Sequence, residues 1–402
     1  MDNYGFYKYA ASENHFASLT KALNSAKTTF ETQKTLKRIT KSDICYAHMG
    51  QLIIKDGVCY ATFIQNPGND GEEQTSSTSG VVLAVFELED ALKDTFDPER
   101  DIAFYPVGSK GDFCAGYKAS SIFKDNSMCL VGEDLYVCFS FITEDEISHI
   151  FQKTFNIKKK EWVNETKVKL LYNGEEWDFS DEIINRIYID NGVKPRAKGL
   201  IELVSAWSEY KGEFYATGLT IGGANHGLIV KTNDFQTMEF VDIIPFNDMG
   251  TAEIASYIYN GKLYVACRQD YGIPYLYMGS LDLKSKKWNP HYKVADGNVR
   301  PWFFEYKNEL YLMNTVEERE RRYTNISRVR TWDTPQAFFN KYCPIDTIAT
   351  IKNCGSYFAT AEYNGDIYFI SSYNTESFGK LCLNLYDEDE VNEKLISLFD
   401  RF

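Results

Sequence analysis

The chain contains 402 residues, which is long enough for two ordinary domains or for one large repeat architecture. Hydrophobic residues make up 44% of the sequence and aromatic residues 15%, which excludes wholesale disorder and favours strands over helical bundles. The formal net charge of −14 argues against a sequence-independent nucleic-acid binder and against a protein that binds anionic membranes.

The N-terminal residues and the cysteines do not suggest export or metal binding. Residues 1–16 carry acidic and aromatic side chains where a signal peptide would have a basic end and an apolar run, so we expect a cytoplasmic protein. A secreted protein whose leader had been removed would look the same. The nine cysteines are scattered and never spaced as CxxC, so we interpret them as small core hydrophobes rather than as disulfides or metal ligands. We expect neither a metal nor a cofactor.

A short pattern recurs six times along the chain: a turn, followed by a strand-like run centred on an apolar residue and a tyrosine. Another strand-like run precedes each occurrence, and Asp-Gly, Asn-Gly or Lys-Gly often joins the two runs, which is typical of a β-hairpin. A looser pair of strand-like runs follows. The six tyrosines are Tyr60, Tyr136, Tyr215, Tyr264, Tyr311 and Tyr368.

Six units of about four strands predict an all-β fold, a six-bladed β-propeller, because radial repetition of four-stranded sheets leaves only short, protected edges. Five blades with a cap, or seven blades with one in the N-terminal region, are the alternatives. We interpret residues 1–402 as a single propeller domain, in which residues 1–43 are a candidate for closing the ring. Short helices are expected near the termini, over 14–38 and 388–402, and the acidic segment 173–192 reads as an insertion.

In a propeller, the first residues of each innermost strand crowd the central axis at one face. In this sequence the positions are almost all ionisable or phenolic, although buried strand starts are normally small or apolar. Such side chains are costly to bury unless they pair with one another or meet a polar ligand. These six positions are His48, Lys124 or its neighbour Ser120, Glu202, Glu253, Arg300 and Tyr357.

Arg268 ends the hairpin that contains Glu253, and together with Arg300 it could bind a carboxylate in a bidentate manner. The order Glu253, Arg268, Arg300, Tyr357 resembles that of the sialidase (neuraminidase) superfamily of six-bladed propellers. The resemblance implies an exo-glycosidase acting on a terminal acidic or unusual sugar. It makes Tyr357 the nucleophile, Glu253 the base that activates it, and the two arginines the clamp for the substrate carboxylate.

The chemistry suits these residue types. A neutral phenol avoids the repulsion that an aspartate nucleophile would meet at a carbon bearing a carboxylate. It needs a neighbouring carboxylate to take its proton, because its free pKa is about 10. Asp70 is our candidate for the general acid. Further candidate substrate contacts are Arg196, Lys198, His226 and Arg322.

The sequence leaves two other functions open. His48 stands where the sialidase family usually has an arginine, so His48, Tyr357 and the arginines could instead serve a uronate-directed polysaccharide lyase or hydrolase. The repeated Asp-box of the family is present only in degenerate form at 232–240 and 280–288, which favours a non-catalytic propeller that binds a glycan or a protein. We expect a glycan or oligosaccharide partner, no nucleic acid and no membrane, and the oligomeric state is open.

Overall fold

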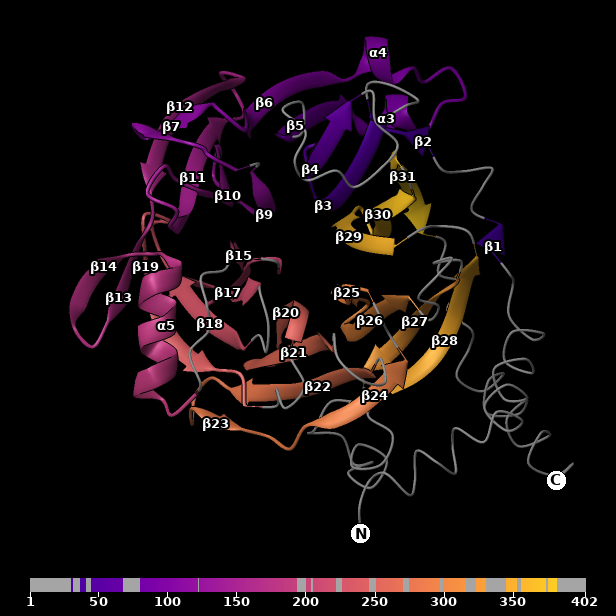
Figure 1. The fold of residues 1–402 in the computed structure, drawn as a ribbon. Coiled ribbons are helices and arrows are strands. Elements are labelled where there is room, and N and C mark those ends of the chain that lie inside the picture. The colour runs from indigo at the N-terminus through magenta and orange to yellow at the C-terminus, as the bar shows by residue number, and fades with distance from the viewer. Residues whose placement is uncertain are drawn as a thin grey trace, which may run out of the picture.

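Strands dominate the computed structural model of the chain, which describes residues 30–31, 37–40, 45–67, 80–121, 123–193, 200–203, 205–221, 226–245, 251–269, 275–296, 299–315, 323–329, 345–352, 356–373 and 375–381. Within these ranges the strands form six sheets of four or more strands and one two-stranded sheet. The six large sheets are arranged in a ring (Figure 1). This β-propeller-like ring confirms the predicted all-β fold class.

Sheets 1 to 3 come from the first part of the chain. Sheet 1 has the order β3 (Cys45–Lys55), β4 (Val58–Pro67), β5 (Gly80–Glu87), β6 (Ala103–Ser109). Sheet 2 has the order β9 (Lys124–Val131), β10 (Asp134–Ile142), β11 (Ser148–Asn156), β12 (Glu161–Lys167). Sheet 3 has the order β15 (Leu200–Leu203), β17 (Glu213–Ile221), β18 (Gly227–Thr232), β19 (Thr237–Ile243), β13 (Lys169–Tyr172), β14 (Glu175–Asp178), with β16 (Ser208–Tyr210) also paired to β17. The two-stranded sheet contains β7 (Phe113–Cys114) and β8 (Tyr117–Lys118).

Sheets 4 to 6 complete the ring. Sheet 4 contains β20 (Thr251–Tyr259), β21 (Lys262–Gln269), β22 (Tyr275–Asp282), β23 (Lys287–Trp288) and β24 (Tyr292–Asp296), the last two both paired to β22. Sheet 5 has the order β25 (Trp302–Tyr306), β26 (Glu309–Thr315), β27 (Tyr323–Val329), β28 (Ile345–Lys352), β1 (Phe30–Glu31). Sheet 6 has the order β29 (Ser356–Tyr363), β30 (Asp366–Tyr373), β31 (Thr375–Leu381), β2 (Lys37–Arg38).

The first strand of each sheet lies toward the centre of the ring (Figure 1). We call β3, β9, β15, β20, β25 and β29 the inner strands. Strand β3 contacts β9, β9 contacts β15, and sheet 3 contacts β20 through β16 and β17. Strand β20 contacts β25, β25 contacts β29, and β29 returns to β3. The ring is therefore closed, and the starts of strands far apart in sequence come together at its centre.

The hairpins between first and second strands follow the predicted pattern. The turn residues Asp56 and Gly57 have φ values of 52° and 80°, and Asn260 and Gly261 have 49° and 72°. Two consecutive residues with positive φ match the twist of the flanking strands, which is why Asn-Gly and Asp-Gly occur there. Each repeat tyrosine is the third residue of the second strand; these strands are β4, β10, β17, β21, β26 and β30. The predicted hairpins are confirmed.

The predicted helix over 14–38 is wrong where the structure describes that segment. Residues Lys37–Arg38 form β2 and pair antiparallel with β31, and Phe30–Glu31 form β1 and pair parallel with β28. The local pattern is polar and has no strand signal, but the outer edges of sheets 5 and 6 offer unpaired backbone groups to this segment. Strand pairing at these edges decides its conformation. The predicted helix 388–402 lies outside the described residues.

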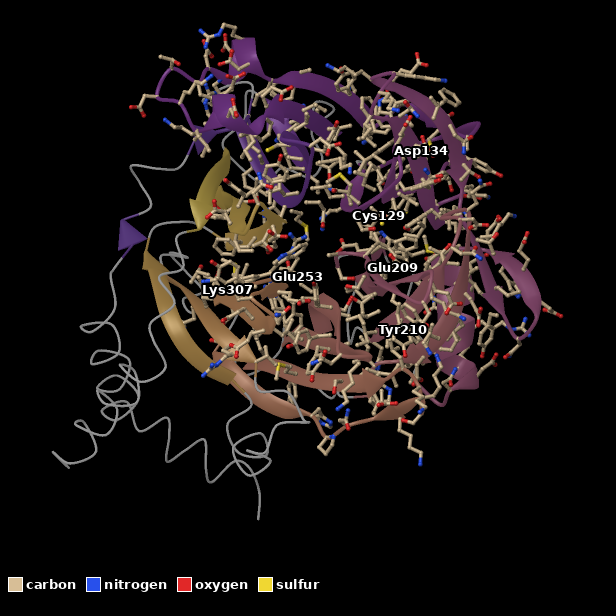
Figure 2. The ribbon with its side chains drawn as sticks, turned by 180° about the vertical axis from the view of Figure 1, so that it is seen from behind. Cys129, Asp134, Glu209, Tyr210, Glu253 and Lys307 are labelled. Atoms are coloured by element: carbon tan, nitrogen blue, oxygen red, sulfur yellow. The ribbon has the colours of Figure 1, made fainter. Side chains whose placement is uncertain are left out.

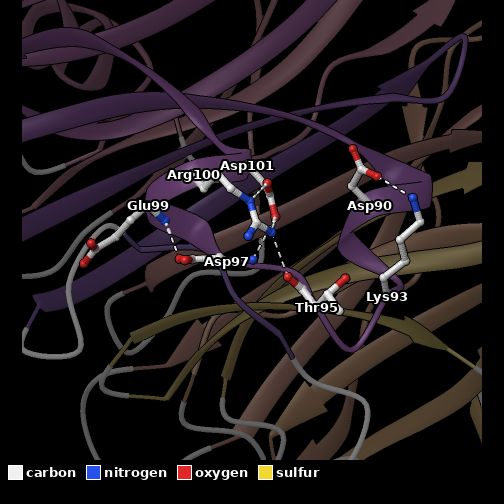
Figure 3. Close-up of polar contacts among 7 residues, drawn as sticks. All are labelled: Asp90, Lys93, Thr95, Asp97, Glu99, Arg100 and Asp101. Carbon is white, nitrogen blue, oxygen red and sulfur yellow. Dashed lines mark hydrogen bonds and ion pairs between the residues drawn. The ribbon is translucent and has the colours of Figure 1, made fainter.

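Two short helices connect β5 to β6 beside the place where the ring closes: α3 (Leu88–Ala91) and α4 (Pro98–Asp101) (Figure 3). Asp97 caps α4 by accepting a hydrogen bond from the Glu99 amide at 3.0 Å. Arg100 donates to both carboxylate oxygens of Asp101 at 2.7 Å and to the Thr95 carbonyl at 2.8 Å. Lys37 of β2 lies 3.3 Å from Asp94 in the same connection, so this polar loop links sheet 1 to the last strand of sheet 6.

The insertion predicted at 173–192 contains β14 and α5 (Asp181–Asp190). The apolar face of α5, which includes Ile183, Ile184 and Ile187, belongs to a buried cluster with residues of sheets 2 and 3. The cysteine interpretation is confirmed for the five thiols that the structure describes, since all are buried and free: Cys59, Cys114, Cys129, Cys138 and Cys267. Burial raises the pKa of the Cys114 and Cys129 thiols to about 12.

Candidate functional site

Four inner strands contain a β-bulge near the start, in which two residues oppose one residue of the neighbouring strand. On β9 the bulge lies between Lys124 and Ser127. On β20, Ala252 and Glu253 together face Arg268 of β21. On β3 and β29 the bulges lie between His48 and Gln51 and between Ser356 and Ala359. Bulges re-aim side chains and are over-represented beside active sites.

Two of these bulges contain a non-glycine residue in the left-handed region. Met49 has a φ of 60° and Tyr357 a φ of 56°. Such a conformation costs on the order of 1–3 kcal/mol and persists only where the surrounding structure imposes it. The β29 bulge therefore holds Tyr357 in an orientation that a regular strand would not give it.

Arg268 joins two of the predicted site residues. Its Nη1 donates to Glu253 Oε2 at 2.8 Å and to the Tyr357 hydroxyl oxygen at 3.3 Å. The side chains are mostly buried, with 19% of Arg268 and 10% of Glu253 exposed. Glu253 lies near the centre of the ring (Figure 2). One guanidinium nitrogen thus holds a carboxylate of sheet 4 and a phenol of sheet 6 together at the axis.

His48 and Arg300 also contact Tyr357. The His48 and Tyr357 ring centroids are 3.7 Å apart with an interplanar angle of 59°. The guanidinium carbon of Arg300 lies 5.9 Å from the Tyr357 ring centroid, within cation–π range. Only 3% of Tyr357 is exposed. The structure therefore brings together five of the residues singled out from the sequence, and we call Glu253, Arg268, Arg300, Tyr357 and His48 the axial cluster.

Arg300 is the most deeply buried member of the axial cluster, with 1% of the residue exposed. Its Nη2 donates to the Gly50 carbonyl at 2.8 Å and to the Phe358 carbonyl at 3.2 Å. Its guanidinium carbon also lies 5.3 Å from the Trp302 ring centroid. Arg300 therefore binds the backbone of two inner strands, β3 and β29.

A second group of buried polar residues lies on the side of the axis formed by sheets 1 to 3. Lys124 and Glu202 are both buried at the starts of their inner strands, as the sequence predicted. Asn126 accepts a hydrogen bond from the Thr62 hydroxyl and donates to the Met49 carbonyl at 3.4 Å. This group contributes polar contacts between sheets 1 and 2 in the interior of the ring.

Of the remaining site residues predicted from the sequence, the structure describes only His226, which is not part of the axial cluster. His226 precedes β18, and its backbone carbonyl accepts a hydrogen bond from the Tyr188 hydroxyl of α5. The other four lie outside the described residues: Asp70, Arg196, Lys198 and Arg322. Sequence reasoning also missed Gly50 and Phe358, since their contribution comes through backbone carbonyls. The glycine directly after Met49 was the one available signal for a bulge there.

A buried histidine lies away from the axis, on β11. His149 is 4% exposed, and burial, with a smaller contribution from the Lys167 ammonium, lowers its pKa to about 4. Lys167 lies 2.7 Å from Asp178 and 4.0 Å from the Tyr117 ring centroid. We therefore expect His149 to be neutral in the folded protein at neutral pH.

Metal coordination and membrane insertion are two other kinds of function on which the described residues bear. In that part of the chain, no three or more His, Cys, Asp or Glu side chains are grouped as metal ligands would be. None of the described helices has the length and apolar character needed to cross a bilayer.

No family model and no curated protein sequence matches the chain. Among solved structures, a protein of unknown function from Dyadobacter fermentans superposes with a TM-score of 0.59 at 10% identity, covering 86% of this chain and 97% of that one. Trypanosoma rangeli sialidase, solved with the inhibitor DANA, gives a TM-score of 0.56 at 11% identity over 92% of this chain and 61% of its own. A Hadza microbial sialidase gives a TM-score of 0.57 at 10% identity, over 85% of this chain and 66% of its own. The chain thus spans less than two thirds of each sialidase, and the likeness shows a sialidase-like fold.

Proposed function

We propose that this protein is a sialidase-like exo-glycosidase that hydrolyses a terminal acidic or unusual sugar with Tyr357 as nucleophile. The observation that carries the proposal is the contact of Arg268 Nη1 with both the Glu253 carboxylate and the Tyr357 hydroxyl. The sialidase-like fold supports it. In this interpretation the six large sheets are the six blades of one propeller, and the substrate is bound at the axis.

The proposed reaction has two displacements at the anomeric carbon. In the first, the Tyr357 oxygen forms a bond to that carbon, the bond to the leaving-group oxygen breaks, and Glu253 takes the phenolic proton. We assign Asp70 as the acid that protonates the leaving group. In the second displacement, Asp70 takes a proton from a water molecule, whose oxygen forms a bond to the same carbon, and Tyr357 leaves with the proton returned from Glu253. Two inversions give net retention of configuration.

Substrate binding is proposed to begin with Arg268, which is the more exposed of the two arginines in the axial cluster. A guanidinium group at this position could bind a sugar carboxylate and would orient Glu253 at the same time. We retain Arg196, Lys198, His226 and Arg322 as proposed further contacts to a glycan.

A second candidate function is a uronate-directed lyase or hydrolase that uses His48. The close packing of the His48 ring on Tyr357 favours it, because a base and a phenolic acid then lie side by side. In a lyase, one of these groups removes the sugar C5 proton while the other protonates the departing oxygen at C4, so that a double bond forms without water.

The test is an activity screen of the wild-type protein on methylumbelliferyl glycosides of N-acetylneuraminic acid, glucuronic acid and neutral sugars, and on uronate polysaccharides. We expect release of methylumbelliferone from at least one acidic glycoside. Tyr357→Phe should lower kcat by at least about a thousand-fold, because it removes the attacking oxygen. Tyr172→Phe is the matched control, since its hydroxyl contacts Asp190 at the outer edge of sheet 3, and it should retain full activity.

The other outcomes of the screen separate the candidate functions. Formation of unsaturated uronate, detected by its ultraviolet absorbance and lost in His48→Gln, would assign the protein to the lyases. Hydrolysis that persists in Tyr357→Phe would exclude the tyrosine nucleophile. If no substrate reacts but a glycan array shows binding, the non-catalytic glycan-binding propeller replaces both enzymes.

A further inference from the structure

We propose that Arg300 is a positioning residue, which holds the Tyr357 side chain beside Arg268 and Glu253 by joining the bulged backbones of β3 and β29. The sequence suggested that Arg300 is the second arginine of a carboxylate clamp. In this proposal it does not have that role. The inference deepens the proposed function and rests on it for the catalytic role of Tyr357.

The two carbonyl groups that Arg300 binds occupy equivalent positions. Gly50 directly follows Met49, and Phe358 directly follows Tyr357; both preceding residues have φ near 60°. In each case these two residues face a single residue of the next strand, so the bulge interrupts the ladder there. Carbonyl groups at a bulge need partners from outside the ladder. Arg300 Nη2 supplies both partners, at 2.8 and 3.2 Å.

The burial of Arg300 and its contacts with backbone carbonyls favour a positioning role over a clamp role. The Nη2 nitrogen carries two hydrogens, and the two carbonyls accept both of them. With 1% of Arg300 exposed, almost none of the residue is open to a substrate carboxylate. Arg268, in contrast, has 19% of its side chain exposed. The two arginines therefore have different tasks.

The position of Tyr357 depends on the backbone that Arg300 holds. The left-handed φ of Tyr357 is unfavourable for a residue with a Cβ, so the strand would relax if the anchor at the adjacent Phe358 carbonyl were lost. The hydroxyl oxygen of Tyr357 is 3.3 Å from Arg268 Nη1, and relaxation would lengthen this contact. A displacement of about 1 Å in a reacting group costs about a hundred-fold in rate.

The kinetic test compares Arg300→Lys and Arg300→Met on the glycoside that the wild type cleaves and on the methyl ester of that glycoside. We expect Arg300→Met to lower kcat about a hundred-fold on both substrates with KM within about three-fold, and Arg300→Lys to restore part of kcat because it can still donate to the carbonyls. Arg328→Met is the matched control: it removes an arginine of the same sheet that contacts Glu309 at 3.3 Å, and kcat should not change. A rise in KM confined to the charged substrate, with kcat unchanged, would make Arg300 a clamp residue and overturn the proposal.

A structural test does not depend on activity. In crystal structures, we expect the wild type to show Nη2 bonded to both carbonyls, and Arg300→Met to show the Tyr357 hydroxyl about 1 Å or more farther from Arg268. If Arg300→Met does not fold, Arg300→Lys is compared with the wild type instead, and we expect a smaller displacement of the Tyr357 hydroxyl. An unmoved Tyr357 in the variant overturns the positioning role even if the protein is a glycosidase. A moved Tyr357 in a protein that cleaves no glycoside keeps the structural role and removes the proposed function.

Discussion

Glu253 and Arg268 form an ion pair within one hairpin of sheet 4, with 2.8 Å between Oε2 and Nη1. The bulge on β20 places Ala252 and Glu253 together opposite Arg268, so that the carboxylate can reach the guanidinium group. Both side chains are mostly buried, and each would be a costly isolated charge without the other.

The first prediction follows from this mutual dependence. Arg268→Met should lower the free energy of unfolding by about 3 kcal/mol, because it leaves the Glu253 carboxylate buried without its main counter-charge. Glu253→Leu should have a similar effect. The double variant should lose less than the sum of the two, with a coupling energy of at least about 1 kcal/mol in urea unfolding.

The exposed pair Lys93–Asp90, with 2.6 Å between its charged atoms, is the control for that cycle. Its charges remain in water, so the same double-mutant cycle should give a much smaller coupling. Additive effects at Glu253 and Arg268 would show that the buried pair does not stabilise the fold.

The second prediction concerns close packing between sheets 1 and 2. A Cβ added at Gly108 would lie 2.1 Å from Cε2 of Phe123, whose ring is stacked on Phe139 at 4.9 Å. Because stacked rings in a dense core cannot move freely, Gly108→Ala should destabilise the protein by about 2–3 kcal/mol. The change in thermal unfolding midpoint and urea midpoint measures it.

Gly227→Ala is the control for Gly108→Ala, because its added Cβ meets side-chain atoms that can move. Its added Cβ would meet the terminal Cδ1 atoms of Ile254 and Ile244, at 2.4 and 2.6 Å, and these can rotate away. We expect a smaller loss of stability than at Gly108. Equal losses would mean that the rigidity of the Phe123 ring does not decide the outcome.

The third prediction uses two adjacent lysines in the turn between β11 and β12. Lys160 has a φ of 56°, whereas Lys159 has no positive φ, and both are exposed. Glycine adopts the left-handed region without a steric penalty, so Lys160→Gly should stabilise the protein by roughly 0.5 kcal/mol. Lys159→Gly should destabilise it by a similar amount, because there glycine only adds freedom to the unfolded chain. The same sign for both in urea unfolding would contradict the argument.

The fourth prediction is a dependence of stability on pH. The pKa of His149 is about 4 in the folded protein, below the ordinary value of 6.5, because of burial and the nearby Lys167; Asp178 and Asp145 oppose the shift. As the pH falls from about 6.5 toward 4, the unfolded chain binds a proton at this histidine that the folded chain does not, so stability falls. His149→Gln should remove on the order of 1 kcal/mol from the stability difference between pH 7 and pH 5. An unchanged difference in urea unfolding would place the pH dependence elsewhere.

Local features of the sequence were sufficient to predict the hairpins and the general fold. The turns at Asp56-Gly57 and Asn260-Gly261 have the positive φ values that those residue pairs favour. Hairpin contacts join neighbours along the chain, so short-range chemistry is enough to specify them. The same reasoning failed at Lys37–Arg38, because an unpaired edge of sheet 6 decides the conformation of that segment.

The sequence by itself also determined which kinds of residue meet at the axis. Glu253 and Tyr357 were singled out from their spacing in the repeats, and Arg268 from its place at the end of the hairpin that contains Glu253. It could not determine what each of them touches. The bulges depend on how two strands come into register, and the contact of Arg300 with Gly50 joins residues 250 positions apart. Only closure of the ring brings β3, β25 and β29 together. In the closed ring Arg300 donates hydrogen bonds to backbone carbonyls, whereas Arg268 contacts the Glu253 carboxylate and the Tyr357 phenol. Long-range packing of the sheets, which no local pattern encodes, therefore decided the geometry of the site.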